Sequence, residues 1–341
     1  MRSVENIIDR AILQNFSDES IIIPTGKKFT SLEPHHFILP EKSEEVSVLS
    51  ESDPLSELDA LIGLAEVKTR IREISALVSL QRQRKVAGLP TKPISTHMVF
   101  SGSPGTGKTT VARLVGQIFK QIGVLEQGHL VEVAREDLVG QYVGHTAAKT
   151  LRQVDLAMGG VLFIDECYSL YNESERDFGH EAISTLVKLM EDSRDNLTVI
   201  FGGYSTEMDK FISMNPGLQS RIQFQIGFPD YHPGELLAIF HKLCRDESYD
   251  LDPTAEVELQ LLLQELYAKR DDNFSNGRLV RSLFERSKLA LALRTWQDPK
   301  EQSLSLITLD DIRPLREYGD IKQIVVNHSR IKRIGFIPTS A

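Results

Sequence analysis

Short apolar runs alternate with helical stripes of apolar residues between positions 61 and 228. Five of the runs have the length and composition of strands, namely residues 98–101, 130–133, 161–164, 197–201 and 222–226. The stretches between them place apolar residues at helical spacing, which indicates strand–helix–strand units. Units of this kind form a mostly parallel sheet with helices on both faces. The pattern therefore predicts an α/β fold for this part of the chain.

After residue 228 the pattern changes to amphipathic helices without a convincing strand. Three stretches read as helices, at 233–247, 253–269 and 277–295. We therefore expect a large α/β domain at residues 53–228, followed by a smaller α-helical lid domain at residues 229–316.

The two ends of the chain differ from these domains. Residues 1–52 begin with apolar positions at helical spacing and end in an acidic, proline-containing linker. The apolar stripe of that short predicted helix either packs on its own domain or docks on a neighbouring subunit or partner. Residues 317–341 form a basic, Ile/Val-rich tail to which the pattern assigns no fold.

Composition narrows the class of protein. The 341 residues are 41% hydrophobic, which is enough for two globular cores, and the net charge of −9 argues against non-specific nucleic-acid binding. Cys167 and Cys244 lie far apart, and the histidines are scattered, so neither a disulfide framework nor a zinc site is expected. The N-terminus is too polar for a signal peptide, and no apolar run has the length of a membrane span. We expect a cytoplasmic protein.

The strongest motif is a glycine-rich phosphate-binding loop between the first predicted strand and a helical stretch at 110–122. Residues 102–109 read GSPGTGKT, which fits G-x-x-x-x-G-K-[ST]. Its glycines let backbone N–H groups surround phosphate oxygens, Lys108 supplies a positive charge, and the Thr109 hydroxyl would bind Mg²⁺. The predicted nucleotide contacts here are Ser103, Pro104, Gly105, Thr106, Gly107, Lys108, Thr109 and Thr110.

A second motif places two carboxylates at the end of a buried strand. Residues 161–166 read VLFIDE, about 55 residues after the phosphate-binding loop. Ligands of open α/β sheets bind at the carboxyl ends of the strands. Asp165 would therefore hold Mg²⁺, and Glu166 would act as the general base that polarises the attacking water. The expected cofactors are ATP and Mg²⁺.

Four further stretches carry a family resemblance: 137–146 (DLVGQYVGHT), 159–166 (GGVLFIDE), 175–183 (ERDFGHEAI) and 215–231 (NPGLQSRIQFQIGFPDY). From about residue 58 to 315, the chain resembles the AAA+ family of red-type Rubisco activases (CbbX) and stage V sporulation protein K. The resemblance implies a P-loop AAA+ module with an α-helical lid. It also implies a hexameric ATPase that pulls a client protein through a central pore.

The resemblance gives roles to residues outside the two motifs. Arg221 resembles the arginine finger that one subunit inserts into its neighbour's ATP site, and Arg278 resembles the second sensor that meets the γ-phosphate. The simpler interpretation of Arg221 is a surface arginine in a salt bridge, and that of Arg278 is a surface arginine at the start of a helix. Tyr204 stands where a polar sensor asparagine is usual, and Gln219 stands where the activases would have a second basic residue. Glu166, Lys108, Arg221, Arg278 and Tyr204 form the predicted catalytic set.

Two more segments receive roles in the same way. Leu61, Ile62 and Gly63 resemble the hydrophobic adenine pocket, although plain core residues would look the same. Tyr142 and Val143 lie in a glycine-flanked loop at the position of the first pore loop, whose aromatic residue grips a polypeptide. A tyrosine packed under its own loop is the alternative.

Three functions remain open at this point. The favoured one is an ATP-dependent protein-remodelling motor with an unidentified client, for which Tyr142 is the discriminating residue. A nucleotide-gated scaffold with slow turnover would have the same catalytic residues. A nucleic-acid-directed AAA+ protein would need a basic stripe, and the loop between Gly140 and Lys149 contains no Lys or Arg. Nucleic-acid and membrane partners are therefore not expected.

Overall fold

A computed structural model describes residues 53–92, 94–142, 144–171, 177–271, 273–297 and 303–318. The predicted N-terminal helix, the acidic linker, residues 319–341 of the basic tail and Val143 lie outside this set. Within it, none of the helices combines the length and the apolar character that crossing a membrane requires.

The centre of the large domain is a five-stranded parallel sheet, which confirms the predicted α/β class. Its strands are β1 (Met98–Gly102), β2 (Leu130–Val133), β3 (Val161–Ile164), β4 (Thr198–Gly203) and β5 (Phe224–Phe228), arranged in the order β2-β3-β4-β1-β5. Every neighbouring pair runs parallel. β1 and β3 flank β4 in the sheet, so the loops that follow these three strands emerge at the same edge.

Two of the predicted strands are displaced along the sequence. The prediction of 222–226 was wrong by two residues, because Ile222 N–H still donates to Leu218 O in the preceding turn. Pairing with β1 begins only at Phe224, opposite Met98. The fourth strand runs on beyond the predicted 197–201 to Gly203, because its pairing with β1 continues to Ser101 opposite Gly203.

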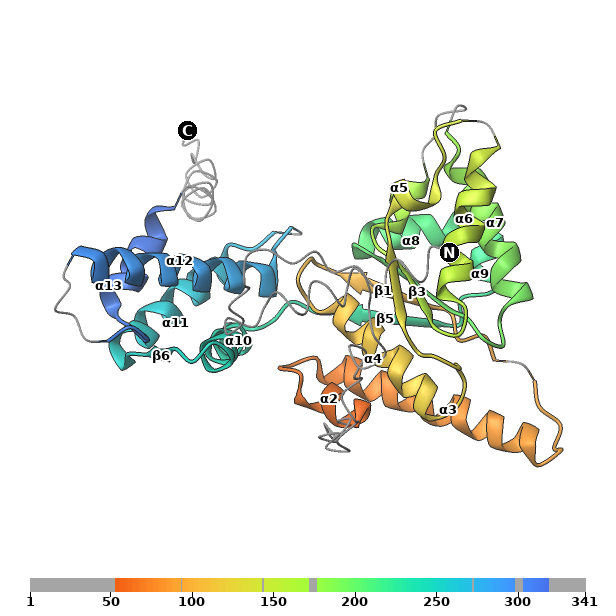
Figure 1. Cartoon of the computed structure of the whole chain (residues 1–341), viewed down its shortest axis with the longest axis horizontal. Coiled ribbons are helices and arrows are strands. Elements are labelled where there is room, and N and C mark those ends of the chain that lie inside the picture. Colours follow the sequence, from red (N-terminus) through yellow and green to blue (C-terminus); the bar gives the residue numbers. More distant parts are fainter. Residues whose placement is uncertain are drawn as a thin grey trace, which may run out of the picture. The chain divides into compact units, whose positions relative to one another are not determined.

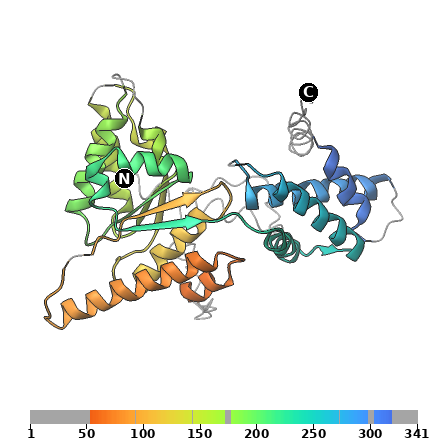
Figure 2. The same cartoon turned by 180° about the vertical axis from the view of Figure 1, so that it is seen from behind.

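Helices cover both faces of the sheet, as Figures 1 and 2 show from opposite sides. Alternate strand residues divide between two apolar clusters, so Phe100 and Phe163 face one layer and Val99 and Leu162 face the other. The first layer contains α2 (Pro54–Ala60), α3 (Ala65–Val86) and α4 (Lys108–Gln121). The second contains α5 (Arg135–Leu138), α6 (His145–Ala157), η2 (Cys167–Leu170), α7 (Gly179–Asp192), α8 (Ser205–Ser213) and α9 (Pro216–Gln219).

The lid contains the three predicted helices, α10 (Pro233–Asp246), α11 (Pro253–Ala268) and α12 (Asn276–Gln297). They are followed by α13 (Leu309–Ile312) and η3 (Arg313–Glu317). The expectation of no strand here was wrong, because β6 (Asp250–Leu251) and β7 (Leu306–Ile307) pair in parallel. Two-residue strands are too short to produce an alternating pattern in the sequence.

A buried histidine joins three segments of the large domain. His97 lies directly before β1 and is 1% exposed. Its Nδ1 accepts a hydrogen bond from Val199 N–H at 3.0 Å, so its Nε2–H donates to Met190 O, also at 3.0 Å. This neutral tautomer uses both ring nitrogens, and burial lowers the pKa of the imidazole.

The lowered pKa of His97 predicts acid sensitivity of the fold. Below about pH 6.5 the unfolded chain binds a proton that the folded chain rejects, so the free energy of unfolding decreases as the pH falls. The loss of stability therefore begins near the pKa of the unfolded imidazole and grows as the pH falls further. We expect His97→Asn to be less stable at about pH 7.5 and at about pH 5.5 but to lose less on acidification. Urea unfolding measures this, and an equal loss in both proteins would contradict the assignment.

Candidate active site

The phosphate-binding loop connects the end of β1 to α4, which begins at Lys108. The backbone adopts positive φ at Gly105 (+73°) and Gly107 (+95°). Thr106 Oγ1 donates to Ser103 O at 2.8 Å and closes the loop. A Cβ atom at Gly105 would lie 2.2 Å from the backbone oxygen of Ser275, so close approach of the lid requires glycine there.

Lys108 points back across this loop. Its ammonium donates to Gly102 O at 2.8 Å and to Ser103 O at 2.9 Å. Burial lowers the pKa of the amine, and the nearby carboxylate of Asp165 opposes that shift. A cation held at this point, beside the N-terminus of α4, suits an anionic ligand.

A cavity of about 440 Å³ opens over the loop, and it brings together most of the predicted site residues. These are Leu61, Ile62, Pro104, Gly105, Gly107, Lys108, Thr109, Thr110, Asp165, Glu166, Tyr204 and Arg278. Gly63, Ser103 and Thr106 are neighbours of these residues in the sequence but do not line the cavity themselves. Arg221 and Tyr142 are not part of its wall.

The two carboxylates follow β3 at the edge of the sheet that carries the loop. Glu166 N–H donates to Asp165 Oδ1 at 3.0 Å, and Asp165 N–H donates to Val133 O at 3.0 Å. Glu166 has φ of +46°, a left-handed conformation that costs a non-glycine residue free energy and is characteristic of functional sites. The backbone thus holds both carboxylates at the cavity.

The sequence reasoning missed a third carboxylate. Thr109 Oγ1 donates to Glu132 Oε1 at 3.4 Å, which places this β2 residue beside the hydroxyl of the loop. The available signal was a single charged residue inside an otherwise apolar strand. Thr109 and Asp165, two oxygen donors on one cavity, fit Mg²⁺, which prefers oxygen ligands.

Tyr204 directly follows β4 and lines the same cavity as the two carboxylates. Its ring lies 6.1 Å from that of Tyr168, measured between centroids. Burial, reinforced by Glu166, raises the pKa of Tyr168, so this second phenol stays protonated and uncharged beside the site.

Part of the cavity lining is aliphatic, and some of it comes from the lid. Ile239 and Leu243 of α10 line it together with Leu61 and Ile62. Aliphatic walls of this kind suit the flat, apolar faces of an adenine ring. The sequence reasoning missed the lid residues because they share the helical stripe of ordinary core positions. The other cavity residues it missed are Gly203, Tyr231, Lys242, Asp246, Gly277 and Arg281.

The lid contacts the phosphate-binding loop directly. Gly277 N–H donates to Gly105 O at 3.0 Å, and the Tyr231 hydroxyl donates to Thr106 O at 3.2 Å. Arg278 lines the cavity one residue beyond the first of these contacts. A cationic side chain of the lid therefore faces the same space as Lys108.

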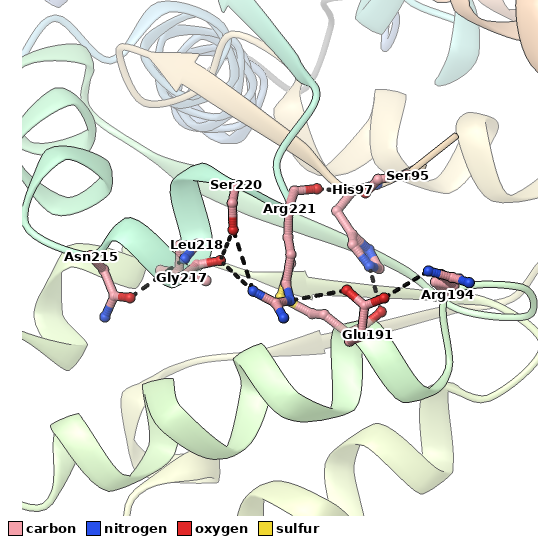
Figure 3. A network of polar contacts seen from close by, with 10 residues as sticks. Ser95, His97, Glu191, Arg194, Asn215, Gly217, Leu218, Ser220 and Arg221 are labelled. Carbon is pink, nitrogen blue, oxygen red and sulfur yellow. Dashed lines mark hydrogen bonds and ion pairs between the residues drawn. The ribbon is translucent and has the colours of Figure 1, made fainter. Parts of the chain in front are cut away.

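Arg221 lies outside the cavity, in the turn after α9 (Figure 3). Its Nη1–H donates to Gly217 O at 3.1 Å and to Ser220 Oγ at 3.3 Å. Its Nε lies 3.3 Å from Glu191 Oε2, an ion pair without hydrogen-bond geometry. The guanidinium cannot serve the cavity of its own subunit from this position.

Tyr142 projects into solvent, with 67% of the residue exposed. Its described ring contact is edge-on to His145, with centroids 5.5 Å apart. Gly144, at φ of +82°, then starts α6. The tyrosine is therefore not packed under its own loop, and Val143 beside it lies outside the described residues.

Comparisons with known proteins agree with this geometry. The "ATPase family associated with various cellular activities (AAA)" matches residues 98–230, and the AAA lid domain matches residues 232–320. Protein CfxQ of Xanthobacter flavus is 47% identical, over 78% of this chain and 84% of its own length. Stage V sporulation protein K of Bacillus subtilis is 41% identical, over 89% of this chain and 95% of its own length. The chloroplastic ribulose bisphosphate carboxylase/oxygenase activase of Cyanidioschyzon merolae is 47% identical, over 75% of this chain and 88% of its own length.

Solved structures support the fold alone. The FIGL-1 AAA domain in complex with ADP superposes with a TM-score of 0.54 at 20% identity, over 82% of this chain and 90% of that one. The branch-migration motor RuvB of Thermotoga maritima superposes with a TM-score of 0.52 at 16% identity, over 80% of this chain and 79% of that one. At these identities the likeness concerns the arrangement of sheet, helices and lid.

Proposed function

Because the chain belongs to the AAA+ family that contains the red-type Rubisco activases and stage V sporulation protein K, we propose that it uses ATP hydrolysis to remodel a client protein. Membership of this family makes it an ATPase. The observation that carries the proposal is the cavity that joins the phosphate-binding loop, two carboxylates and a lid arginine. An exposed tyrosine stands outside that cavity and is free to meet another protein.

Each group around the cavity has a chemical task in this proposal. Lys108 and the loop N–H groups bind the outer phosphates, and the aliphatic wall receives adenine. Thr109 and Asp165 would hold Mg²⁺, which would supply positive charge against the phosphate oxygens when bound. Glu166 takes the proton of the attacking water, and Arg278 contacts the γ-phosphate.

The proposed role of Arg221 as an arginine finger requires a second subunit. Members of this family generally form oligomeric rings, and Arg221 lies away from its own cavity, in an exchangeable contact with Glu191. We therefore propose a homo-oligomer, with a hexamer as its form, in which Arg221 reaches the neighbouring subunit's ATP. Tyr142 and Val143 would line the pore of that ring.

The role of Tyr142 is tested by stimulation of the ATPase with a permanently unfolded polypeptide. We expect the polypeptide to raise the steady-state rate of ATP hydrolysis by the wild type and by Tyr142→Phe, which keeps the aromatic ring of the side chain. Tyr142→Ala should retain the basal rate and lose the stimulation, because its side chain cannot grip the polypeptide. Unchanged stimulation of Tyr142→Ala would contradict the pore role, and no stimulation of any protein would favour the nucleotide-gated scaffold. Inhibited Rubisco, the partner named for a relative, is the first specific client to try in the same assay.

A further inference from the structure

The first residue of α12 is a fully buried asparagine with an unusual backbone and a complete set of partners. Asn276 has φ of +44° and no exposed surface. Its Oδ1 accepts from Tyr231 N–H at 2.9 Å, and its Nδ2 donates to Asp230 Oδ1 at 2.8 Å and to Phe274 O at 2.9 Å. One side chain thus joins the linker between β5 and α10 (residues 229–232) to the turn that starts α12.

The same residue also reaches the phosphate-binding loop. Pro104 O lies 3.4 Å from Asn276 Nδ2, and the next residue, Gly277, donates its N–H to Gly105 O at 3.0 Å. Ser275, on the other side, is so close to Gly105 that no Cβ atom fits between them. The turn around Asn276 is therefore in direct contact with the loop that holds the phosphates.

The direction of Arg278 depends on this turn. Arg278 N–H donates to Ser275 O at 2.9 Å, so the first turn of α12 starts from the backbone that Asn276 holds in place. A long side chain amplifies a small rotation of its helix into a large displacement of its guanidinium. A displacement of about 1 Å in a catalytic group can cost roughly 10²-fold in rate.

We propose that Asn276 is a positioning residue for ATP hydrolysis, which holds the start of α12 against the phosphate-binding loop so that Arg278 faces the outer phosphates. The inference rests on the proposed role of Arg278 in hydrolysis. Asn276 itself contacts no nucleotide and acts through the arginine two residues later. Its amide meets the linker, the lid and the loop at once, which a residue serving the lid core alone would not do.

The test is a double-mutant cycle on Asn276 and Arg278. Asn276→Gly accepts the positive φ and removes only the amide, so the backbone is not strained. We expect Asn276→Gly to lower kcat about 10-fold to 10²-fold, with a smaller change in KM for ATP. Arg278→Ala should lower kcat at least as much, and the double variant should be no slower than Arg278→Ala alone.

A matched control separates positioning from general loss of stability. Ser287 is also fully buried on α12, and its hydroxyl donates to Leu283 O of its own helix within the part of the chain that the structure describes, so Ser287→Ala should leave kcat unchanged. Thermal unfolding midpoints of all variants are measured alongside. Multiplicative losses in the double variant, or a wild-type kcat in Asn276→Gly, would overturn the proposal. A wild-type kcat in Arg278→Ala would instead overturn the proposed role of that arginine, whatever Asn276→Gly does.

Discussion

Replacing Glu166 with glutamine is expected to lower kcat for ATP hydrolysis by about 10²–10⁴-fold while ATP binding persists. The amide keeps the shape of the side chain and cannot accept the proton of the attacking water. The groups proposed to bind phosphate, Lys108 and the backbone of the loop, are unchanged in this variant. Single-turnover hydrolysis and equilibrium binding of a fluorescent ATP analogue measure the two properties separately.

The third carboxylate near the site, that of Glu132, provides the comparison for this experiment. Glu132 lies beside the Thr109 hydroxyl on β2, at the edge of the sheet, and Glu166 follows the inner strand β3. We expect Glu132→Gln to reduce kcat far less than Glu166→Gln, because Glu132 does not line the cavity. The opposite order, or a wild-type rate for Glu166→Gln, would move the role of base to the other carboxylate.

The elements that bind phosphate could be predicted from the sequence because their chemistry is local. A strand, a glycine-rich turn and a helix follow one another at residues 98–121, so one short stretch of sequence contains the whole phosphate-binding motif. The carboxylates at 165 and 166 were equally visible, since four apolar residues before them form a fully buried strand.

What the sequence could not supply depends on contacts between distant segments. Ile239 and Leu243 have the spacing of any amphipathic helix, and only the fold of the linker turns them toward the cavity. Asn276 occurs in a motif whose arginine drew attention, and its own role depends on partners 45 to 172 positions away. The shift of β5 has a local cause instead, because the turn after α9, in which Ile222 N–H donates to Leu218 O, takes up two residues whose alternation fits a strand.

Replacing Arg221 with alanine is expected to reduce the ATPase rate of the assembled protein by about 10³-fold, because a finger supplies charge to the transition state. The wild-type rate per subunit should rise with protein concentration as rings form. Arg194→Ala is the matched control, since Arg194 pairs with the same Glu191 carboxylate and is not part of the cavity. A wild-type rate in Arg221→Ala would leave the arginine as a partner of Glu191 alone.

Mixing the two inactive variants distinguishes a finger in trans from one in cis. An Arg221→Ala subunit retains Glu166, and a Glu166→Gln subunit retains Arg221, so one interface of a mixed ring contains both groups. We expect the mixture to hydrolyse ATP faster than either variant alone, with a maximum near equal proportions. The position of Arg221 outside its own cavity makes this recovery a geometric requirement of the proposal. If the rates of the two variants merely average, each site is complete within one subunit and the finger must be sought elsewhere.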